Sequence, residues 1–159
     1  MILVTLGTQD KKFYRLLEAI QEQIDKNNIK DKVIVQAGYS SDFKSADMEI
    51  FDLMPMDDFE KIIAECDILI THGGVGSIIS GLKQKKIVIA AARLKEYGEH
   101  TNNHQLQIIE NFAKEKYILA LDDFKDLYKV LQDAKTFKPK QYKSNTSNFI
   151  KLIEEEIES

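Results

Sequence analysis

The sequence contains one cysteine, two prolines and no tryptophan among its 159 residues. The single cysteine, Cys66, excludes an internal disulfide framework and a cysteine-based zinc site. No apolar run approaches the ~20 residues that are needed to span a bilayer. Met1 leads directly into apolar residues, without the basic segment that opens a secretory signal peptide. We therefore expect a cytoplasmic protein without a membrane span.

The chain also lacks an excess of positive charge. Lysine and arginine total 22 and aspartate and glutamate total 26, which gives a formal net charge of −4. Nucleic-acid binding needs a strong cationic field, so we do not expect a nucleic acid as a partner. Hydrophobic residues make up 43% of the chain and charged residues 30%, a composition typical of a globular protein.

Short apolar runs alternate along the chain with segments whose apolar residues recur at helical spacing. We expect strands at residues 2–6, 32–37, 48–53, 67–71, 86–91 and 117–121, and helices at 13–24, 57–63, 78–82, 102–114 and 123–134. This alternation predicts an α/β fold with a doubly wound, mostly parallel, Rossmann-like sheet. Residues 1–136 form this domain, and residues 137–159 form a linker and a C-terminal helix that closes the domain or docks on another chain.

A glycine-rich turn is the strongest local signal. The apolar strand at 67–71 runs directly into His72-Gly73-Gly74-Val75-Gly76-Ser77, and a helix starts there. Glycines let a backbone approach a ligand closely, and a helix N-terminus attracts phosphate groups. The pattern therefore predicts a phosphate or diphosphate site, although a tight strand-to-helix turn without a ligand has the same appearance. The turn is neither a Walker A loop nor a G-x-G-x-x-G dinucleotide fingerprint.

A second polar segment follows the next strand and opens the next helix. Its candidate ligand-binding residues are Glu99, His100, Asn103, His104 and Gln105. Because ligands of doubly wound sheets bind at the carboxyl ends of the strands, both polar segments are expected to line one crevice. Carboxylate and amide groups would bind sugar or ribose hydroxyls there. The alternative is an ordinary polar helix start with capping residues.

Two more loops belong to the same predicted edge. Gly7-Thr8-Gln9 follows the first strand, and Gln36-Ala37-Gly38 follows the second.

All three histidines, His72, His100 and His104, lie in the two polar segments, so a metal site completed by Glu99 is an alternative. The spacing of these residues does not match the zincin motif, and we expect no metal ion.

In combination, these residues resemble the C-terminal, sugar-nucleotide-binding domain of the family 28 glycosyltransferases, and especially its small stand-alone version. The matching stretches are 2–9, 35–38, 67–77, and Arg93 with Glu99, His100, Asn103, His104 and Gln105. The resemblance implies one half of a GT-B fold that binds a UDP-sugar as donor substrate, without a cofactor. It also implies a membrane-associated partner subunit that binds the acceptor and brings this chain to the inner membrane face.

The resemblance further implies roles for individual residues. His72 through Ser77 would cradle the diphosphate, Glu99 would hold the ribose hydroxyls, and His104 and Gln105 would reach the sugar. Met54-Pro55-Met56 lies where the family often contacts the base. The other residues expected to contact the substrate are Gly7, Thr8, Gln9, Met56, Arg93, His100 and Asn103.

The implied reaction is transfer of a hexose or an N-acetylhexosamine, with inversion, to a lipid-linked acceptor, by an enzyme that needs its partner chain. Backbone N–H groups would stabilise the departing UDP. His72 is a candidate general base by position, but we prefer a residue of the partner chain. The acceptor is that of bacterial capsule or exopolysaccharide synthesis, which the composition favours, or of dolichol-linked glycan synthesis. The alternative functions are a non-catalytic sugar-nucleotide-binding module and, less favoured, a metal-dependent hydrolase with His and Glu ligands. Self-association into a homo-oligomer is compatible with each of these functions.

Overall fold

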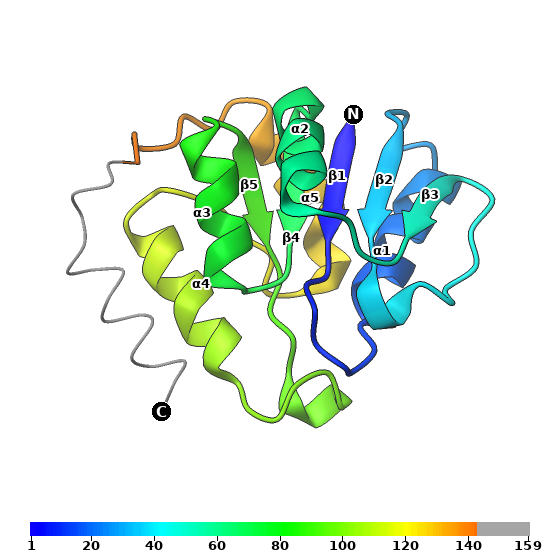
Figure 1. Cartoon of the computed structure of the whole chain (residues 1–159). Helices are drawn as coiled ribbons and strands as arrows, with labels where there is room; N and C mark the ends of the chain where they lie inside the picture. Colours follow the sequence, from blue (N-terminus) through cyan, green and yellow to red (C-terminus); the bar gives the residue numbers. More distant parts are fainter. Residues whose placement is uncertain (143–159) are drawn as a thin grey trace.

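The computed structural model describes residues 1–142 and contains one sheet of six parallel strands (Figure 1). The strands are β1 (Ile2–Thr5), β2 (Val33–Gln36), β3 (Met48–Phe51), β4 (Ile68–Thr71), β5 (Ile87–Ala90) and β6 (Leu119–Ala120). Their order is β3-β2-β1-β4-β5-β6, and every neighbouring pair is parallel. The predicted doubly wound, Rossmann-like α/β fold is confirmed.

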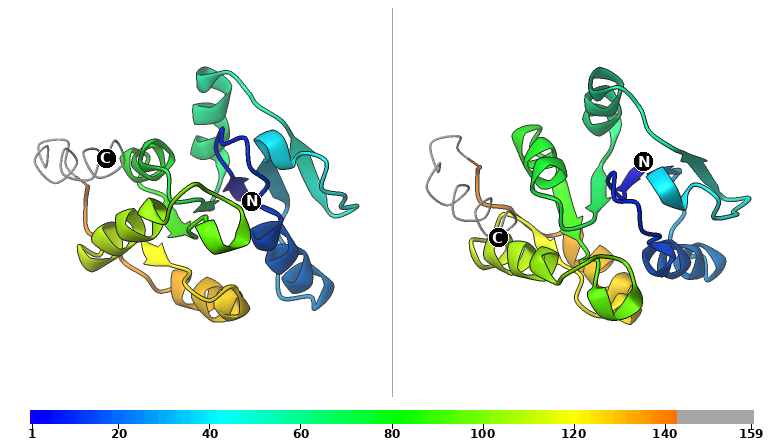
Figure 2. Two further views of the ribbon diagram at one scale, coloured as in Figure 1. Left: turned by 90° about the horizontal axis from the view of Figure 1, so that it is seen from below. Right: turned by 60° about the horizontal axis from the view of Figure 1, so that its bottom comes forward.

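Within residues 1–142, five α-helices cover the two faces of the sheet: α1 (Tyr14–Asp25), α2 (Met56–Glu65), α3 (Val75–Lys83), α4 (His104–Lys114) and α5 (Leu127–Ala134). Helices α1 and α5 pack on one face, and α2, α3 and α4 pack on the other (Figure 2). Alternate residues of β1 point to opposite faces, with Val4 in the first core cluster and Leu3 in the second. This two-sided burial explains why the central strands are almost continuously apolar.

Several element ends differ from the predicted ones. Strand β6 has only two residues, and the segment predicted as a helix from 123 begins as a 3-10 turn, η3 (Phe124–Asp126), which the Asp123 side chain caps. Pro55, rather than an aspartate, occupies the N-cap of α2; Asp57 and Asp58 lie in its first turn, where they complement the helix dipole. Residues 137–142 contain neither helix nor strand, and the predicted C-terminal helix lies outside the described residues.

The strand order reverses between β1 and β4, and this switch point determines where the site lies. The two strands end side by side, with the Thr5 hydroxyl donating to the Thr71 hydroxyl over 2.7 Å. The backbone N–H of His72 then donates to the carbonyl of Thr5. Consequently, the loops that follow β1 and β4 start from adjacent positions. No described helix has both the length and the apolar character that a membrane span requires.

Helix α3 lies unusually close to the sheet at Gly81. A methyl group there would come within 2.7 Å of Leu69 Cδ2 and 2.8 Å of Val88 Cγ2, whereas a methyl group at Gly76 of the same helix would meet nothing within 4 Å. We expect Gly81→Ala to lower the free energy of unfolding by about 1–2 kcal/mol through overpacking. Gly76→Ala should raise it by up to about 1 kcal/mol through helix propensity. Urea unfolding of both variants tests this; equal stabilities would contradict the close packing.

Candidate functional site

The N-terminus of α3 faces the switch point and is open. Gly74 is the N-cap, no described side chain caps this end, and the first turn holds no acidic residue. The N–H of Ile78 is bonded to the carbonyl of Gly74, so the preceding N–H groups of Val75, Gly76 and Ser77 belong to the unpaired first turn. Gly76 is exposed. Backbone donors and the positive end of the helix dipole together attract an anion.

The imidazole of His72 fills the space between two glycines. A Cβ at Gly7 would lie 2.5 Å from His72 Nε2, and a Cβ at Gly74 would lie 2.3 Å from His72 Cε1. Gly7 also has a φ of 77°, in the left-handed region that favours glycine. The loops after β1 and β4 therefore approach each other with only the His72 ring between them.

The side chain of Gln105 determines the tautomer of His72. Its Oε1 accepts hydrogen bonds from the backbone N–H groups of Gly73 and Arg93, each over 3.0 Å, which identifies Oε1 as the carbonyl oxygen. Its Nε2 lies 3.1 Å from His72 Nδ1 and therefore donates to that nitrogen. The neutral imidazole then carries its proton on Nε2, on the side of the two glycines.

His72 is also uncharged at neutral pH. Burial, reinforced by the positive charge of Arg93, lowers the pKa of His72 to about 3. With Nδ1 accepting from Gln105 and Nε2 protonated, neither ring nitrogen has a free lone pair to take up a proton. This arrangement argues against the sequence-based suggestion that His72 is a general base.

Arg93 contacts the protein's own backbone instead of facing the crevice. Its side chain is buried, with 1% of its surface exposed. The guanidinium donates to the carbonyls of Leu6, Lys11 and Glu99. Burial lowers the pKa of Arg93 to about 10, so it remains protonated at neutral pH. Arg93 therefore connects the loop after β1 with the segment after β5, whereas the sequence analysis expected it at the substrate.

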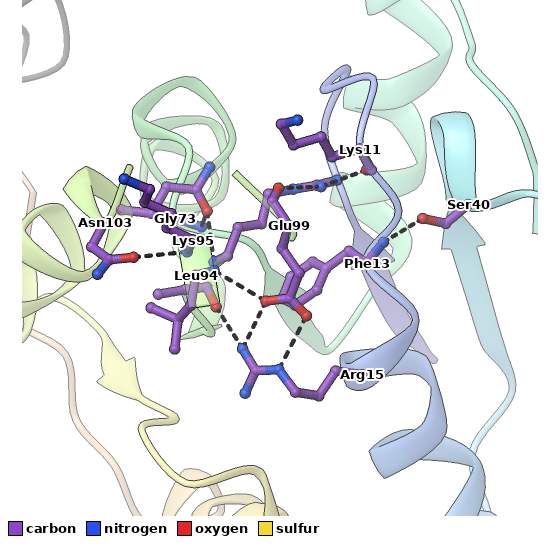
Figure 3. A network of polar contacts seen from close by, with 12 residues as sticks. Lys11, Phe13, Arg15, Ser40, Gly73, Leu94, Lys95, Glu99 and Asn103 are labelled. Atoms are coloured by element: carbon purple, nitrogen blue, oxygen red, sulfur yellow. Dashed lines mark hydrogen bonds and ion pairs between the residues drawn. The ribbon is translucent and has the colours of Figure 1, made fainter. Parts of the chain in front are cut away.

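Glu99 is bound by protein groups as well (Figure 3). Arg15 donates to both carboxylate oxygens, from Nη2 to Oε1 over 2.9 Å and from Nε to Oε2 over 3.1 Å. The N–H of Leu94 also donates to Oε1 over 3.0 Å. The expected ribose ligand thus points toward α1. Sequence reasoning missed Arg15, because nothing distinguishes it from an ordinary polar residue at a helix start.

The other predicted residues of this region lie at the start of α4. Asn103 is exposed and accepts from the N–H of Lys95 over 2.8 Å. His100 is half-buried, and burial, together with the charge of Arg93, lowers the pKa of its ring. Nδ1 of His104 is buried and has no hydrogen-bond partner among the described residues. Within residues 1–142, no three histidine, cysteine or carboxylate side chains gather closely enough to hold a metal ion.

A pocket of about 170 Å³ lies beside the open end of α3. Its lining consists of Gly7, Thr8, Gln36, Leu53, Met54, Met56, Phe59 and Ser77. The walls come from the loops after β1 and β3, from the end of β2 and from the first turns of α2 and α3, and most of them are apolar. Gln9, in the same loop as Thr8, is half-buried and does not line the pocket. An apolar pocket with a few polar groups suits a planar ring that carries hydrogen-bonding edges.

The sequence matches a known protein family over almost its whole length. Residues 1–157 match the glycosyltransferase family 28 C-terminal domain. The chain belongs to this family. The resemblance of the sequence to that domain is therefore confirmed.

Individual relatives agree with the family assignment. The chain is 37% identical over 79 residues to the UDP-N-acetylglucosamine transferase subunit ALG13 of Candida albicans; the match spans 48% of this chain and 25% of that protein. A solution structure of ALG13 has a TM-score of 0.61 at 20% identity, covering 99% of this chain and 96% of that one. The kitacinnamycin glycotransferase also gives 0.61, at 14% identity, with 99% of this chain on 39% of that chain. The fold is one Rossmann-like half of a GT-B glycosyltransferase.

The low pKa of His72 has a measurable consequence for stability. An unfolded histidine binds a proton below pH 6.5, whereas the folded one stays neutral down to about pH 3. The unfolded state thus binds more protons in this window, so the contribution of His72 to stability is complete above pH 6.5 and is lost as the pH falls. Between pH 6.5 and 5 we expect the chain to lose roughly 1.5 kcal/mol more than His72→Asn. Urea unfolding at both pH values measures this; equal losses would contradict it.

Proposed function

We propose that this chain is the donor-binding subunit of a two-chain, inverting glycosyltransferase that uses a UDP-sugar. The open N-terminus of α3 beside an apolar pocket carries the proposal. Ser77 belongs to both features, and Gly7 and Thr8 line the pocket next to the His72 ring. An anion site joined to a ring pocket at the switch point of a doubly wound sheet matches a nucleoside diphosphate. Uracil would occupy the pocket, and the diphosphate would lie on α3.

The sugar and the acceptor are proposed from the name of a relative and from the chemistry of glycosyl transfer. The name of the Candida albicans relative specifies UDP-N-acetylglucosamine, so N-acetylglucosamine is the first sugar to test. A lipid-linked saccharide is the acceptor that we propose, in bacterial capsule or exopolysaccharide synthesis or in a dolichol-linked pathway. A hydroxyl of that acceptor attacks C1 of the sugar, the bond from C1 to the β-phosphate oxygen breaks, and UDP leaves.

The residues of this chain would act on the leaving group. Negative charge develops on the β-phosphate as the bond breaks, and the N–H groups of the first turn of α3 are preorganised to stabilise it. His72 would add a hydrogen bond from Nε2. Because a helix N-terminus supplies this stabilisation, we propose no metal ion and no cofactor. The proton of the acceptor hydroxyl then passes to a base on the partner chain.

A partner chain completes the proposed enzyme. A GT-B glycosyltransferase has two Rossmann-like domains, and this chain spans 39% of the kitacinnamycin glycotransferase. We propose that the acceptor-binding domain is a separate membrane-associated chain, which holds this one at the cytoplasmic face. The word "subunit" in the name of the relative supports this arrangement.

Calorimetric titration of the purified chain tests donor binding. UDP, UDP-N-acetylglucosamine, UDP-glucose and UDP-galactose are added with and without a chelator. We expect UDP to bind with the same affinity under both conditions, and one sugar to be preferred. Chelator-sensitive binding or hydrolysis by the chain alone would favour the metal-hydrolase alternative. Binding without transfer in the presence of the acceptor subunit would favour the non-catalytic module.

Gly76 offers a sharper test, because it is exposed and its substitution meets no neighbour. Gly76→Asp places a carboxylate in the first turn of α3, where it stabilises the helix dipole but repels a diphosphate. We expect UDP affinity to fall by roughly 100-fold while urea unfolding shows equal or higher stability. The matched control, Gly76→Asn, has the same shape without the charge and should lose much less affinity. Equal affinities of the two variants would refute a diphosphate at this helix end.

A further inference from the structure

Arg15 lies at a junction of three separate parts of the chain. It belongs to the first turn of α1, bonds the Glu99 carboxylate and donates to the Ala92 carbonyl over 3.2 Å. Its guanidinium carbon is 3.8 Å from the centroid of the Phe124 ring and 4.3 Å from that of Tyr97. Arg15 therefore holds the β5–α4 segment (residues 91–103) against α1 through Glu99 (Figure 3). Its contact with Phe124 adds η3 to the same junction.

The charges of Arg15 and Glu99 compensate each other. A positive charge in the first turn of a helix opposes the helix dipole, and the Glu99 carboxylate offsets that cost. The Glu99 side chain is 4% exposed and that of Arg15 is 24% exposed. Removing one member of a buried pair leaves an uncompensated charge, which is strongly unfavourable. Tyr97 and Phe124 add cation–π contacts to the same guanidinium.

This pairing leaves Glu99 little capacity to bind a ribose. Three N–H groups, two from Arg15 and one from Leu94, occupy its two oxygens. The Glu99 side chain is only 4% exposed, so a nucleotide hydroxyl would have to reach a nearly enclosed carboxylate whose charge Arg15 already neutralises. Opening this enclosure would disturb the Arg15 pair, whose charge-assisted hydrogen bonds are stronger than one hydrogen bond to a neutral hydroxyl.

The same contacts lead to the candidate site. The Glu99 backbone carbonyl accepts from the Arg93 guanidinium, and the Arg93 backbone N–H donates to Gln105. Gln105 in turn bonds the N–H of Gly73 and the ring of His72. A continuous chain of bonds thus connects α1 with the glycine-rich turn, and the position of the β5–α4 segment affects the turn that precedes α3.

We propose that Arg15 is a positioning residue. It binds the Glu99 carboxylate, so that this carboxylate holds the β5–α4 segment against α1 and does not contact the donor. The importance of this role for donor binding rests on the proposed function. Glu99 then contributes to UDP binding only through Arg15 and the glycine-rich turn. The 2′ and 3′ hydroxyls of the ribose are recognised by other groups.

Hydrogen exchange of the ligand-free chain tests the positioning role. In Arg15→Gln we expect amide exchange in residues 94–103 to accelerate at least about tenfold, because the pair no longer holds this segment. The control is Glu22→Gln, on the same helix, whose ion pair with Lys26 is exposed. Unchanged exchange of residues 94–103 in Arg15→Gln would overturn the proposal.

Titration with two nucleotides tests the role of Glu99. UDP and 2′-deoxyuridine diphosphate are titrated into the wild-type chain, Arg15→Gln, Glu99→Gln and the double variant. We expect each single change to weaken UDP roughly tenfold and the double change to cost no more than the worse single one. The preference for UDP over its deoxy analogue should be the same in all four proteins. Loss of this preference in Glu99→Gln alone would make Glu99 a direct ribose ligand and overturn the proposal.

Uridine separates a positioning effect from a general loss of structure. The pocket expected to bind the base contains neither Arg15, Arg93, Glu99 nor Gln105. We therefore expect uridine affinity, followed by chemical-shift titration, to stay unchanged in Arg15→Gln while UDP affinity falls. Equal losses for uridine and UDP would overturn a specific positioning role. If the wild-type chain binds neither UDP nor its analogue, the proposed function fails, and the exchange experiment alone decides whether Arg15 holds the segment.

Discussion

The geometry of the site depends on the hydrogen bonds that the Gln105 carboxamide makes. Its oxygen accepts from Gly73 and Arg93, which follow two neighbouring strands, and its nitrogen fixes the protonation of His72. A Cβ at Gly73 would lie 2.5 Å from Cβ of Gln105, so α4 can carry this side chain into place only because residue 73 is glycine. The glycine-rich turn is therefore shaped as much by the helix that packs on it as by its own flexibility.

The side chains of Arg93 and Arg15 hold the loops of the site in place, whereas backbone N–H groups face the crevice. Arg93 and Arg15 are both bound to carbonyl or carboxylate oxygens of the protein. The open end of α3, by contrast, offers N–H groups and a neutral histidine. Fixed dipoles stabilise a leaving diphosphate without the reorganisation that flexible charged side chains require. The two arginines contribute to this preorganisation by holding the dipoles in place.

Sequence patterns were sufficient to predict the fold and the proximity of the two polar segments. Apolar strands alternating with amphipathic helices predicted the parallel sheet, and the rule for carboxyl ends placed the two polar segments together. The functions of single side chains in those segments could not be predicted in this way. Arg93, Glu99 and Gln105 are polar residues in loops, where a side chain that binds the backbone and one that binds a ligand have the same sequence pattern. Their partners, such as Arg15 or the Lys11 carbonyl, are distant in sequence and carry no motif.

Most of the large hydrophobic side chains that are exposed within residues 1–142 lie at the edge that carries the candidate site. Of the five large hydrophobic side chains that are exposed within residues 1–142, four lie in the segments that follow the carboxyl ends of the strands, with Met56 as the first residue of α2: Tyr39, Leu53, Met56 and Tyr97. Glycosyl transfer must exclude water from the reacting sugar, because water competes with the acceptor hydroxyl. An exposed site on a single domain does not provide that exclusion. A second domain seated over this edge would bury the four side chains and separate the reaction from solvent, which gives a physical reason for the second domain of the proposed enzyme.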